Sequence, residues 1–317
     1  MQYLMTAKIV IVGSFNADLT SYMKRMPRPG ETVQGRKFVV GPGGKGSNQA
    51  VAAARLGAEV TFVGRVGQDV FTPVALSLWK EEGVDFEFVV QDPDHSTGVA
   101  PIFVDDTGEN SIVVVLGSNL ALSKEDIEAA ADAILHCDIF MTQLEIDYAT
   151  VAYALKTAKD LGVQTILNPA PAGDLPSEVL KLADYLTPNE TELEILSNMP
   201  GASLEDAARS LLTREDQTII VTLGSKGALM VGRDDSFISP AYEVHVVDTT
   251  GAGDAFNGGL AVSLAEGKSL QKAIAFANAA AALCVTKPGT APSMPMRGEV
   301  DALVADVGRL TMYVPGQ

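Results

Sequence analysis

Short runs of β-branched residues alternate with helical patterns along most of the chain, and this alternation limits the fold more than any other feature. The clearest run, Lys8–Gly13, has only Ile and Val between its ends. Such runs are typical of strands buried on both faces of a parallel sheet. Similar runs follow at Val60–Gly64, Asp138–Gln143, Gln164–Asn168, Tyr185–Thr187 and Thr218–Gly224, and helical patterns lie at Ser47–Leu56, Pro73–Glu82, Lys124–Leu135, Ala149–Leu161 and Ser203–Leu212. Alternating strands and helices predict an α/β fold with a mostly parallel sheet covered by helices on both faces.

Two regions depart from this alternation. Thr32–Val40 is a strand pattern with no helix before it, and Thr97–Val104 is followed directly by Asn110–Leu116. The segment Asp105–Glu109, which joins the second pair, has the residues of a hairpin loop. We expect a small antiparallel sheet that forms a lid over a site. An edge extension of the main sheet is the alternative interpretation.

Composition indicates a folded globular protein and excludes some partners. The 317 residues are 47% hydrophobic and 20% charged, which suits one large elaborated α/β domain or two domains. The formal net charge of −17 argues against binding to nucleic acid or to an anionic membrane, because phosphate contacts need clustered basic residues. A small phosphate ligand can still be bound locally by backbone N–H groups and a metal ion.

The cysteines and the N-terminus indicate a cytoplasmic protein. Cys137 and Cys284 are far apart and form no C-x-x-C pair, so a disulfide framework is not expected. Residues 1–8 show no basic segment followed by a long apolar one, and the apolar run Ile9–Val12 is far too short to span a membrane.

A glycine-rich segment, Gly41-Pro-Gly-Gly-Lys-Gly46, follows one strand and precedes a helix. It satisfies the G-x-G-x-x-G pattern of dinucleotide-binding proteins, and Arg65 after the next strand could suit NADP. An NADP-dependent oxidoreductase is therefore one candidate. Lys45 and Asn48 beside these glycines instead favour a site for hydroxyl or phosphate oxygens. No G-x-x-x-x-G-K-[ST] run occurs, so an ATP site would have to be built in another way.

A second glycine-rich segment, Asp248-Thr-Thr-Gly-Ala-Gly-Asp254, joins a strand to a predicted helix that begins near Gly251. The free N–H groups and positive dipole end of a first helical turn form an anion site. Asp254 in that turn could simply complement the dipole, which contributes about 0.3–1 kcal/mol. The glycines around Asp254 favour another function, in which its carboxylate accepts a proton from an attacking hydroxyl beside a bound phosphate.

Two further segments lie at predicted strand ends, where parallel sheets bind ligands. Asn189 and Glu192 are one helical turn apart and could hold phosphate oxygens and a hydrated Mg²⁺, but for this segment taken alone a helix N-cap with an acidic first turn is the favoured interpretation. The segment Val221–Gly227 is either a ligand loop or an ordinary hairpin turn.

Together these motifs resemble the ribokinase (PfkB-type) carbohydrate kinase family. Both family signatures are present, Gly43-Gly-Lys-Gly-x-Asn48 and the segment that ends at Asp254, and the resemblance extends from Gly13–Leu19 to Pro288–Ser293. It implies a ribokinase-like three-layer sandwich, one α/β kinase domain over residues 1–317, with lid strands at about 14–20, 32–41, 97–104 and 110–117.

The resemblance also implies a role for each matching residue. Sugar hydroxyls would be held by Asn16, Asp18, Gly44, Lys45, Asn48 and Glu145. An anion hole at Gly251, Ala252 and Gly253 would flank the base Asp254. The ATP site would include Asn189, Thr222, Gly224, Gly227 and Asn278, with Glu192 helping to place Mg²⁺. A monovalent cation such as K⁺ would be bound by Asp248, by the carbonyl oxygens of Thr250, Cys284, Lys287 and Gly289, and by the Ser293 hydroxyl.

The expected reaction is ATP-dependent phosphorylation of a sugar, with O5 of D-ribose as the expected acceptor. The resemblance also implies a homodimer formed through the lid. A deoxyribokinase, or another sugar or nucleoside kinase of the family, is the alternative; a non-catalytic sugar sensor would be expected to lack Asp254. Three positions depart from the family pattern: Ser47 and Ser118 replace a usual Ala, and Asn278 replaces a frequent His. Because these positions are expected near the substrate or the adenine, they bear on the identity of the sugar and not on phosphoryl transfer.

Overall fold

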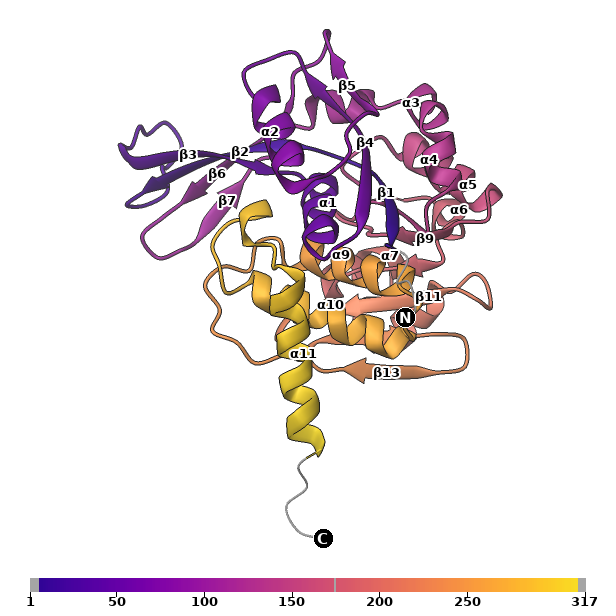
Figure 1. Ribbon diagram of the computed structural model, residues 1–317. Helices are drawn as coiled ribbons and strands as arrows, with labels where there is room; N and C mark the ends of the chain where they lie inside the picture. Colours follow the sequence, from indigo (N-terminus) through magenta and orange to yellow (C-terminus); the bar gives the residue numbers. More distant parts are fainter. Residues whose placement is uncertain (1–5, 174, 313–317) are drawn as a thin grey trace.

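The computed structural model describes residues 6–173 and 175–312. Residues 1–5, part of the N-terminal segment 1–8 in which the sequence shows no signal-peptide pattern, lie outside the described residues. A nine-stranded sheet runs through the centre of the molecule, in the order β13-β12-β11-β10-β9-β8-β1-β4-β5 (Figure 1). Its strands are β1 (Lys8–Val12), β4 (Glu59–Gly67), β5 (Val89–Asp92), β8 (Ile139–Thr142), β9 (Gln164–Leu167), β10 (Tyr185–Leu186), β11 (Thr218–Thr222), β12 (Ala228–Val231) and β13 (Ser236–Ser239).

Most neighbouring strands of this sheet are parallel, as predicted. The exceptions are β11–β12 and β12–β13, which form an antiparallel edge. The strand order reverses at β1, which lies between β4 on one side and β8 on the other. Ligands of open α/β sheets bind at the carboxyl ends of the strands beside such a reversal. The topology therefore points to the carboxyl ends of β1 and β8.

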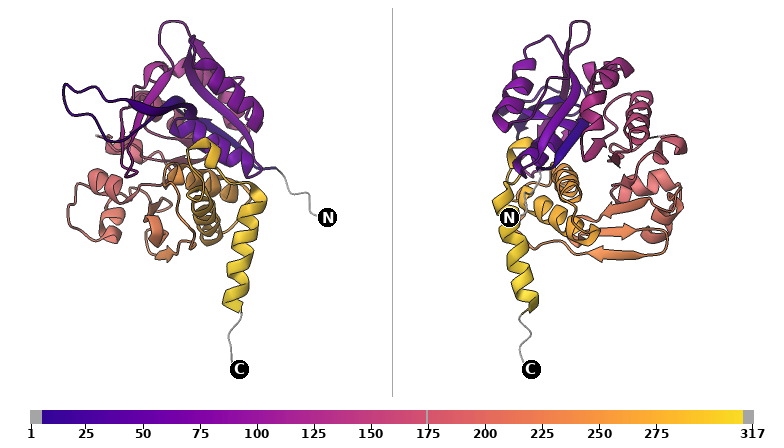
Figure 2. Two further views of the ribbon diagram at one scale, coloured as in Figure 1. Left: turned by 90° about the vertical axis from the view of Figure 1, so that its left-hand side faces the viewer. Right: turned by 45° about the vertical axis from the view of Figure 1, so that its right-hand side comes forward.

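Helices cover both faces of the sheet, which makes three layers (Figures 1 and 2). Alternate residues of β1 separate the two cores: Ile9 and Ile11 pack in one, Val10 and Val12 in the other. The first core contains residues of α1 (Lys45–Arg55), α2 (Thr72–Glu82), α9 (Ala252–Ala265), α10 (Leu270–Cys284) and α11 (Arg297–Met312). The second contains residues of α3 (Lys124–Ala129), α4 (Ala131–Leu135), α5 (Tyr148–Asp160), α6 (Ser177–Leu180), α7 (Glu190–Ser197) and α8 (Leu204–Ser210).

The predicted helix over Lys124–Leu135 is two helices, α3 and α4. The chain leaves the helical conformation at the buried Ala130 (φ −91°, ψ 4°). Because no Gly or Pro marks this position, the sequence offered no signal for the break. Trp79 of α2 is fully buried against Phe15 and Phe62.

A second, four-stranded sheet projects from the main body (Figure 2). It consists of β2 (Asn16–Met23), β3 (Gly35–Gly43), β6 (Gly98–Val104) and β7 (Asn110–Ile112), in the order β3-β2-β6-β7. Two pairings are antiparallel as predicted, whereas β2 and β6 are parallel, with Asn16 opposite Gly98 and Tyr22 opposite Val104. Both strands begin at the main body and run outward, so they point the same way. We call this sheet the lid.

Among the residues that the structure describes, no helix combines the length and the apolar character needed to cross a membrane.

Candidate active site

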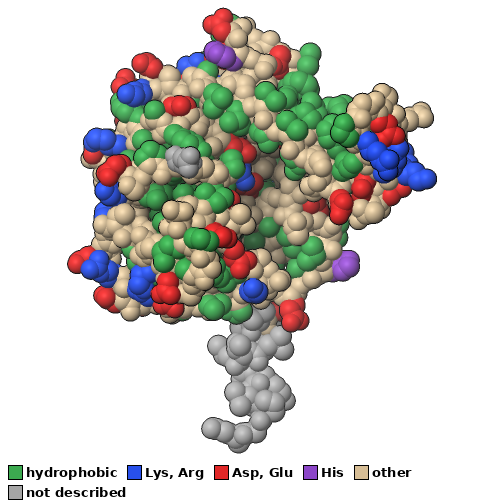
Figure 3. All heavy atoms as spheres, turned by 180° about the vertical axis from the view of Figure 1, so that it is seen from behind, with side chains coloured by type: hydrophobic (Ala, Val, Ile, Leu, Met, Phe, Trp, Pro, Cys, Tyr) green, Lys and Arg blue, Asp and Glu red, His purple; other side chains and the backbone are tan. Residues whose placement is uncertain are grey.

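A cavity of about 170 Å³ lies at the carboxyl ends of the central strands, close to the strand-order reversal. Figure 3 shows a groove on this face, with acidic and basic side chains in its walls. The residues that line the cavity come from the ends of β9, β10 and β11 and from the starts of α1, α7 and α9. They are Lys45, Asn168, Ala170, Thr187, Asn189, Glu192, Thr222, Thr249, Gly251, Ala252, Gly253, Asp254 and Asn257.

The start of α9 forms one wall of this cavity. Gly251 is the N-cap residue and has φ +82°, a left-handed conformation that favours glycine. Ala252 and Gly253, the first residues of α9 after this turn, line the cavity, and the Ala252 N–H lies 3.4 Å from the Thr249 carbonyl oxygen. The predicted anion hole and the predicted base are thus brought together in one helical turn.

Asp254 is almost completely buried, with 7% of its surface exposed. Asn48 Nδ2 donates to its Oδ2 at 2.9 Å, and Gln49 Nε2 donates to its Oδ1 at 3.1 Å. Burial raises the pKa of Asp254, and the positive charge of Lys45 and these two amides oppose the rise. A carboxylate whose pKa is raised is a stronger base and is suited to accept a proton. Asn48 Oδ1 is buried without a hydrogen-bond partner, so it can accept from a ligand hydroxyl.

The predicted sugar-binding residues surround a second buried carboxylate, Glu145. Its Oε2 accepts hydrogen bonds from Ser14 Oγ (2.5 Å), Asn16 Nδ2 (3.3 Å) and the backbone N–H of Lys45 (3.0 Å). Gly44 (φ +89°) is the N-cap residue of α1, and its backbone packs closely on Phe15. A Cβ added to Gly44 would lie 2.7 Å from the Cα of Phe15. The contact explains why glycine precedes Lys45.

Asp18, on β2, brings a third carboxylate to the same place. Its pKa is raised to about 7, mainly by burial and also by the charges of Glu145 and Asp254, against a hydrogen bond from Thr290 that lowers it. Lys45 is the basic residue among those lining the cavity. Burial alone would lower the pKa of Lys45, but Asp254, Glu145 and Glu192 outweigh it, and the pKa is raised. The site therefore holds one ammonium group among several carboxylates.

The predicted nucleotide residues are only partly brought together. Asn189 and Glu192 form a capping box on α7, in which each side chain accepts the other's backbone N–H at 2.8 Å. The N-cap interpretation is thus confirmed, and both residues also line the cavity together with Thr222. Burial raises the pKa of Glu192 against the hydrogen bond from Asn189.

Gly224, Gly227 and Asn278 lie apart from the cavity lining. The segment after Thr222 is a hairpin turn between β11 and β12, as one interpretation expected. Asn278 Nδ2 donates to the carbonyl of Ser239 at 3.0 Å, beside which Gly227 also packs. These residues form a neighbouring cluster at the β12–β13 edge.

The predicted cation ligands lie together in the loops beside α9 and α10. Asp248 accepts the N–H groups of Thr250 and Gly289, each at 2.9 Å, and Cys284 Sγ lies 3.1 Å from Ser293 Oγ. Lys287 differs, since its ammonium pairs with Glu299 at 2.9 Å; its predicted contribution was a carbonyl oxygen. Within the described residues, no group of three or more His, Cys, Asp and Glu side chains forms a metal site.

Several residues of the site were missed in the sequence. Gln49, Asn168, Thr187 and Asn257 are buried polar residues of the site, and Thr290 contacts Asp18. Asn168 and Thr187 each follow a strand directly, and this position was the available signal for them. Nothing in the local sequence indicates that Gln49, which follows Asn48 on α1, also reaches Asp254.

The dinucleotide interpretation of Gly41–Gly46 is wrong. Arg65, which could have suited NADP, pairs with two buried carboxylates: Nε is 2.8 Å from Asp126 and Nη1 is 2.9 Å from Asp92. Its charge is therefore used within the scaffold. Ser47 and Ser118 were expected near the substrate or the adenine, but their hydrogen bonds are made within the scaffold. Ser47 Oγ accepts from the Trp79 indole, and Ser118 Oγ donates to the Arg65 carbonyl.

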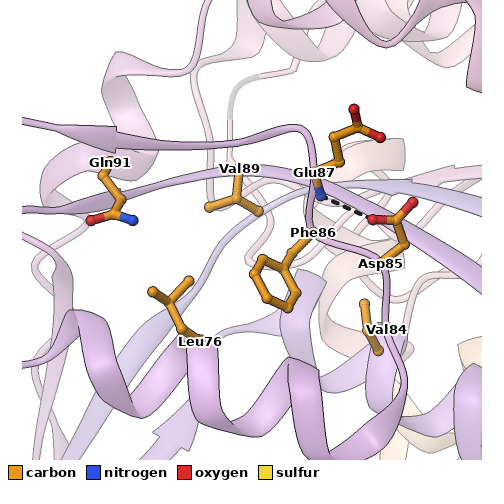
Figure 4. A pocket seen from close by; sticks show the side chains of 7 residues that line it. All are labelled: Leu76, Val84, Asp85, Phe86, Glu87, Val89 and Gln91. Carbon is orange, nitrogen blue, oxygen red and sulfur yellow. Dashed lines mark hydrogen bonds between the residues drawn. The ribbon is translucent and has the colours of Figure 1, made fainter.

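A larger hollow of about 470 Å³ lies between α2 and the edge strand β5 (Figure 4). It contains none of the residues predicted for the site, and its carboxylates have no basic partner among the residues that line it. Those residues are Leu76, Val84, Asp85, Phe86, Glu87, Val89 and Gln91. We therefore assign the chemistry to the smaller, more polar cavity.

Comparison with known proteins agrees with this geometry. Residues 6–297 match the family model described as pfkB family carbohydrate kinase. The chain is 42% identical to a deoxyribokinase of Salmonella typhimurium, over 90% of this chain and 95% of that protein. It is 40% identical to a ribokinase of Haemophilus influenzae, over 93% and 97%.

A solved structure of Arabidopsis thaliana ribokinase complexed with ribose and ATP superposes with a TM-score of 0.86 at 34% identity, covering 95% of this chain and 99% of that one. The ribokinase-like fold, the polar cavity and the matched length lead to one conclusion. The chain belongs to the PfkB family of carbohydrate kinases and is a sugar kinase.

Proposed function

We propose that this chain, a single catalytic domain with its lid, transfers the γ-phosphoryl group of ATP to O5 of D-ribose. The observation that carries the proposal is the position of Asp254, which lies in the first turn of α9, lines the cavity and accepts a hydrogen bond from the amide of Asn48. Gly251, Ala252 and Gly253, the residues of the proposed anion site, line the same cavity. The relatives support the substrates, since one solved relative is a ribokinase complexed with ribose and ATP.

In the proposed reaction Asp254 accepts the proton of the sugar hydroxyl as its oxygen attacks the γ-phosphorus. The new O–P bond forms while the bond from that phosphorus to the bridging oxygen breaks, and ADP leaves. Backbone N–H groups of Gly251, Ala252 and Gly253 stabilise the negative charge on the transferring group. Asn16, Asp18, Gly44, Lys45, Asn48 and Glu145 orient the sugar, and closure of the lid excludes water.

Asn189, Thr222, Gly224, Gly227 and Asn278 form the proposed nucleotide site. The excess of carboxylates over Lys45 would repel a nucleoside triphosphate, so the donor set fits a bound divalent cation. Glu192, whose Oε2 accepts the N–H of Asn189, would help to hold Mg²⁺ through water. When bound, Mg²⁺ neutralises phosphate charge.

We further propose that the loop before α9 and the segment that follows α10 bind K⁺ between them. Carbonyl oxygens of Thr250, Cys284, Lys287 and Gly289, with the Asp248 carboxylate and the Ser293 hydroxyl, form an oxygen-rich donor set of low charge, which suits a monovalent cation. The loop is joined to the sugar site by Thr290, whose hydroxyl lies 3.2 Å from Asp18 Oδ2.

An assay of ADP release over a panel of sugars and nucleosides tests the substrate. We expect D-ribose to give the highest kcat/KM, and we expect activity to need Mg²⁺ and to rise with K⁺. The Asp254→Asn variant serves as the blank. A preference for 2-deoxyribose would instead establish the second candidate, a deoxyribokinase, which the 42% identity to a deoxyribokinase favours. No ADP release above the blank with any sugar would contradict the proposal.

We also propose a homodimer formed through the lid, in the cytoplasm. The lid exposes Phe38 (61%), Val113 (57%) and Phe103 (36%), which the strand register places on one face. Exposed apolar surface of this kind marks interaction sites. Light scattering should give a dimer for the wild type and a monomer for Phe38→Asp with Val113→Asp, whereas a monomeric wild type would refute the proposal.

A further inference from the structure

Gln49 is a completely buried amide that contacts the proposed base. It follows Asn48 on α1, and the two side chains share the carboxylate of Asp254: Asn48 donates to Oδ2 at 2.9 Å and Gln49 donates to Oδ1 at 3.1 Å. The two carboxylate oxygens are therefore each held by one N–H group. Asn48 Oδ1 is buried without a hydrogen-bond partner, whereas Gln49 Oε1 accepts a hydrogen bond from Gln143 Nε2.

The remaining hydrogen bonds of Gln49 fix the orientation of its amide. Nε2 also donates to Asn168 Oδ1 at 3.2 Å, and Oε1 accepts from Gln143 Nε2 at 2.6 Å. Asn168 in turn donates to the carbonyl of Thr187 at 3.1 Å. A carbonyl and a carboxylate can only accept, so neither the Asn168 nor the Gln49 amide can flip without losing a bond.

Close packing of α1 on α9 keeps Gln49 in register with Asp254 (Figure 1). A Cβ at Gly258 would lie 2.6 Å from Cβ of Ala52 and 3.1 Å from the backbone nitrogen of Ala53. The glycine therefore allows the two helices to approach. The strand ends that carry Gln143 and Asn168 hold the other side of the Gln49 amide.

We propose that Gln49 is a positioning residue, which holds the Asp254 carboxylate in the orientation that accepts the proton of the sugar hydroxyl. The inference rests on the proposed role of Asp254 as the base. An N–H group that donates to a carboxylate favours its charged form over the protonated form. Gln49 thus keeps the buried base ionised as well as oriented, without contacting the substrate.

Other charged and titratable groups also act on Asp254. They are Lys45 of α1, Glu145 after β8, Asp18 of β2, Glu192 of α7 and the Cys284 thiol of α10. Replacing Gln49 leaves all of them in place. A change in the titration of Asp254 therefore reports on the Gln49 amide.

Gln49→Met keeps the length of the side chain but removes both donated hydrogen bonds. We expect kcat to fall about 10- to 100-fold, the acidic limb of the kcat–pH profile to move up by about one unit, and the sugar KM to stay within about threefold. Gln49→Glu keeps the shape and adds a like charge, so its acidic limb should move up further.

The matched control is Gln217→Met. Gln217 is equally buried (1% exposed) and donates to the carbonyls of Leu180 and Ala183, remote from the cavity lining. This variant should lose thermal stability and keep the wild-type pH profile. A lower kcat for Gln49→Met with an unmoved acidic limb, or an equal shift in Gln217→Met, would show a merely structural role and overturn the proposal.

A titration without substrate separates this inference from the proposed function. In ¹³C-aspartate-labelled protein, the Asp254 carboxyl resonance is assigned by its loss in Asp254→Asn, and its pKa should be higher in Gln49→Met than in the wild type or Gln217→Met. An unchanged pKa would refute the inference even in an active kinase. An inactive wild type with the expected shift would refute the proposed function alone.

Discussion

Two groups of buried charges in this protein have similar composition and opposite character. Around Arg65, two carboxylates share one guanidinium: Asp126 is bound by two of its nitrogens and Asp92 by the third. Around Lys45, the carboxylates of Asp254, Glu145 and Glu192 act on one ammonium group. The first group joins β4, β5 and α3, whereas the second borders the cavity.

The pKa of Asp92 in the first group is shifted in the opposite direction from the pKa values of Asp254 and Glu192 in the second. Burial disfavours the charge of Asp92, but the backbone N–H of Asp94 and the Arg65 guanidinium outweigh it and lower its pKa to about 2. In the cavity group, burial prevails, and the pKa values of Asp18 and Asp254 are raised. A paired cluster stabilises the fold, and a carboxylate that the fold leaves partly unpaired is available to bind or react.

The largest expected effect comes from replacing Asp254, the proposed catalytic base of the cavity group. Asp254→Asn keeps the shape but cannot accept the proton, so we expect kcat to fall at least 10³-fold. Steady-state ADP release measures kcat, and calorimetry should still detect sugar binding. The variant should be no less stable than the wild type, because a buried carboxylate with a raised pKa is replaced by a neutral amide. Near-normal turnover would remove Asp254 from the mechanism.

The next largest effect is expected from removing the cation of the paired group around Arg65. Arg65→Met leaves Asp92 and Asp126 buried without their cation, so the free energy of unfolding should fall by about 3–5 kcal/mol. Denaturant unfolding measures it, with Arg36→Met as the control. Arg36 forms an exposed pair with Asp106 at 2.6 Å, and its loss should cost no more than about 1 kcal/mol. Equal losses in the two variants would show that the comparison is wrong.

The smallest effect concerns Asp18. Since its folded pKa is about 7, above the ordinary 3.8, the carboxyl is protonated below that pH, and the sugar KM should fall as pH rises through about 7. Ionising it costs folding free energy, so stability is lost as pH rises from about 4 to 7. Asp18→Asn should therefore raise the sugar KM about tenfold while stabilising the free enzyme at pH 8 by about 1 kcal/mol. A pH-independent KM in the wild type would contradict the prediction.

The sequence predicted the layers of the fold because strand and helix periods leave a local record. Lys8–Gly13 and the later runs became parallel strands, and the lid strands were found where helices were missing. The parallel pairing of β2 with β6 was not predicted, since it depends on the direction in which two distant segments leave the main body. The break at Ala130 also had no local signal.

The sequence alone determined which family the chain belongs to and predicted which residues carry the chemistry: glycines that need positive φ, an acid in a first helical turn, and an Asn and a Lys beside glycines are local requirements. Only the tertiary structure decided their partners. Gln49 reaches Asp254 across 205 residues of chain, and Arg65 lies between two carboxylates and not in a nucleotide site. Burial and pairing depend on contacts between distant segments, and these decide whether a charged residue stabilises the fold or stays available for the substrate.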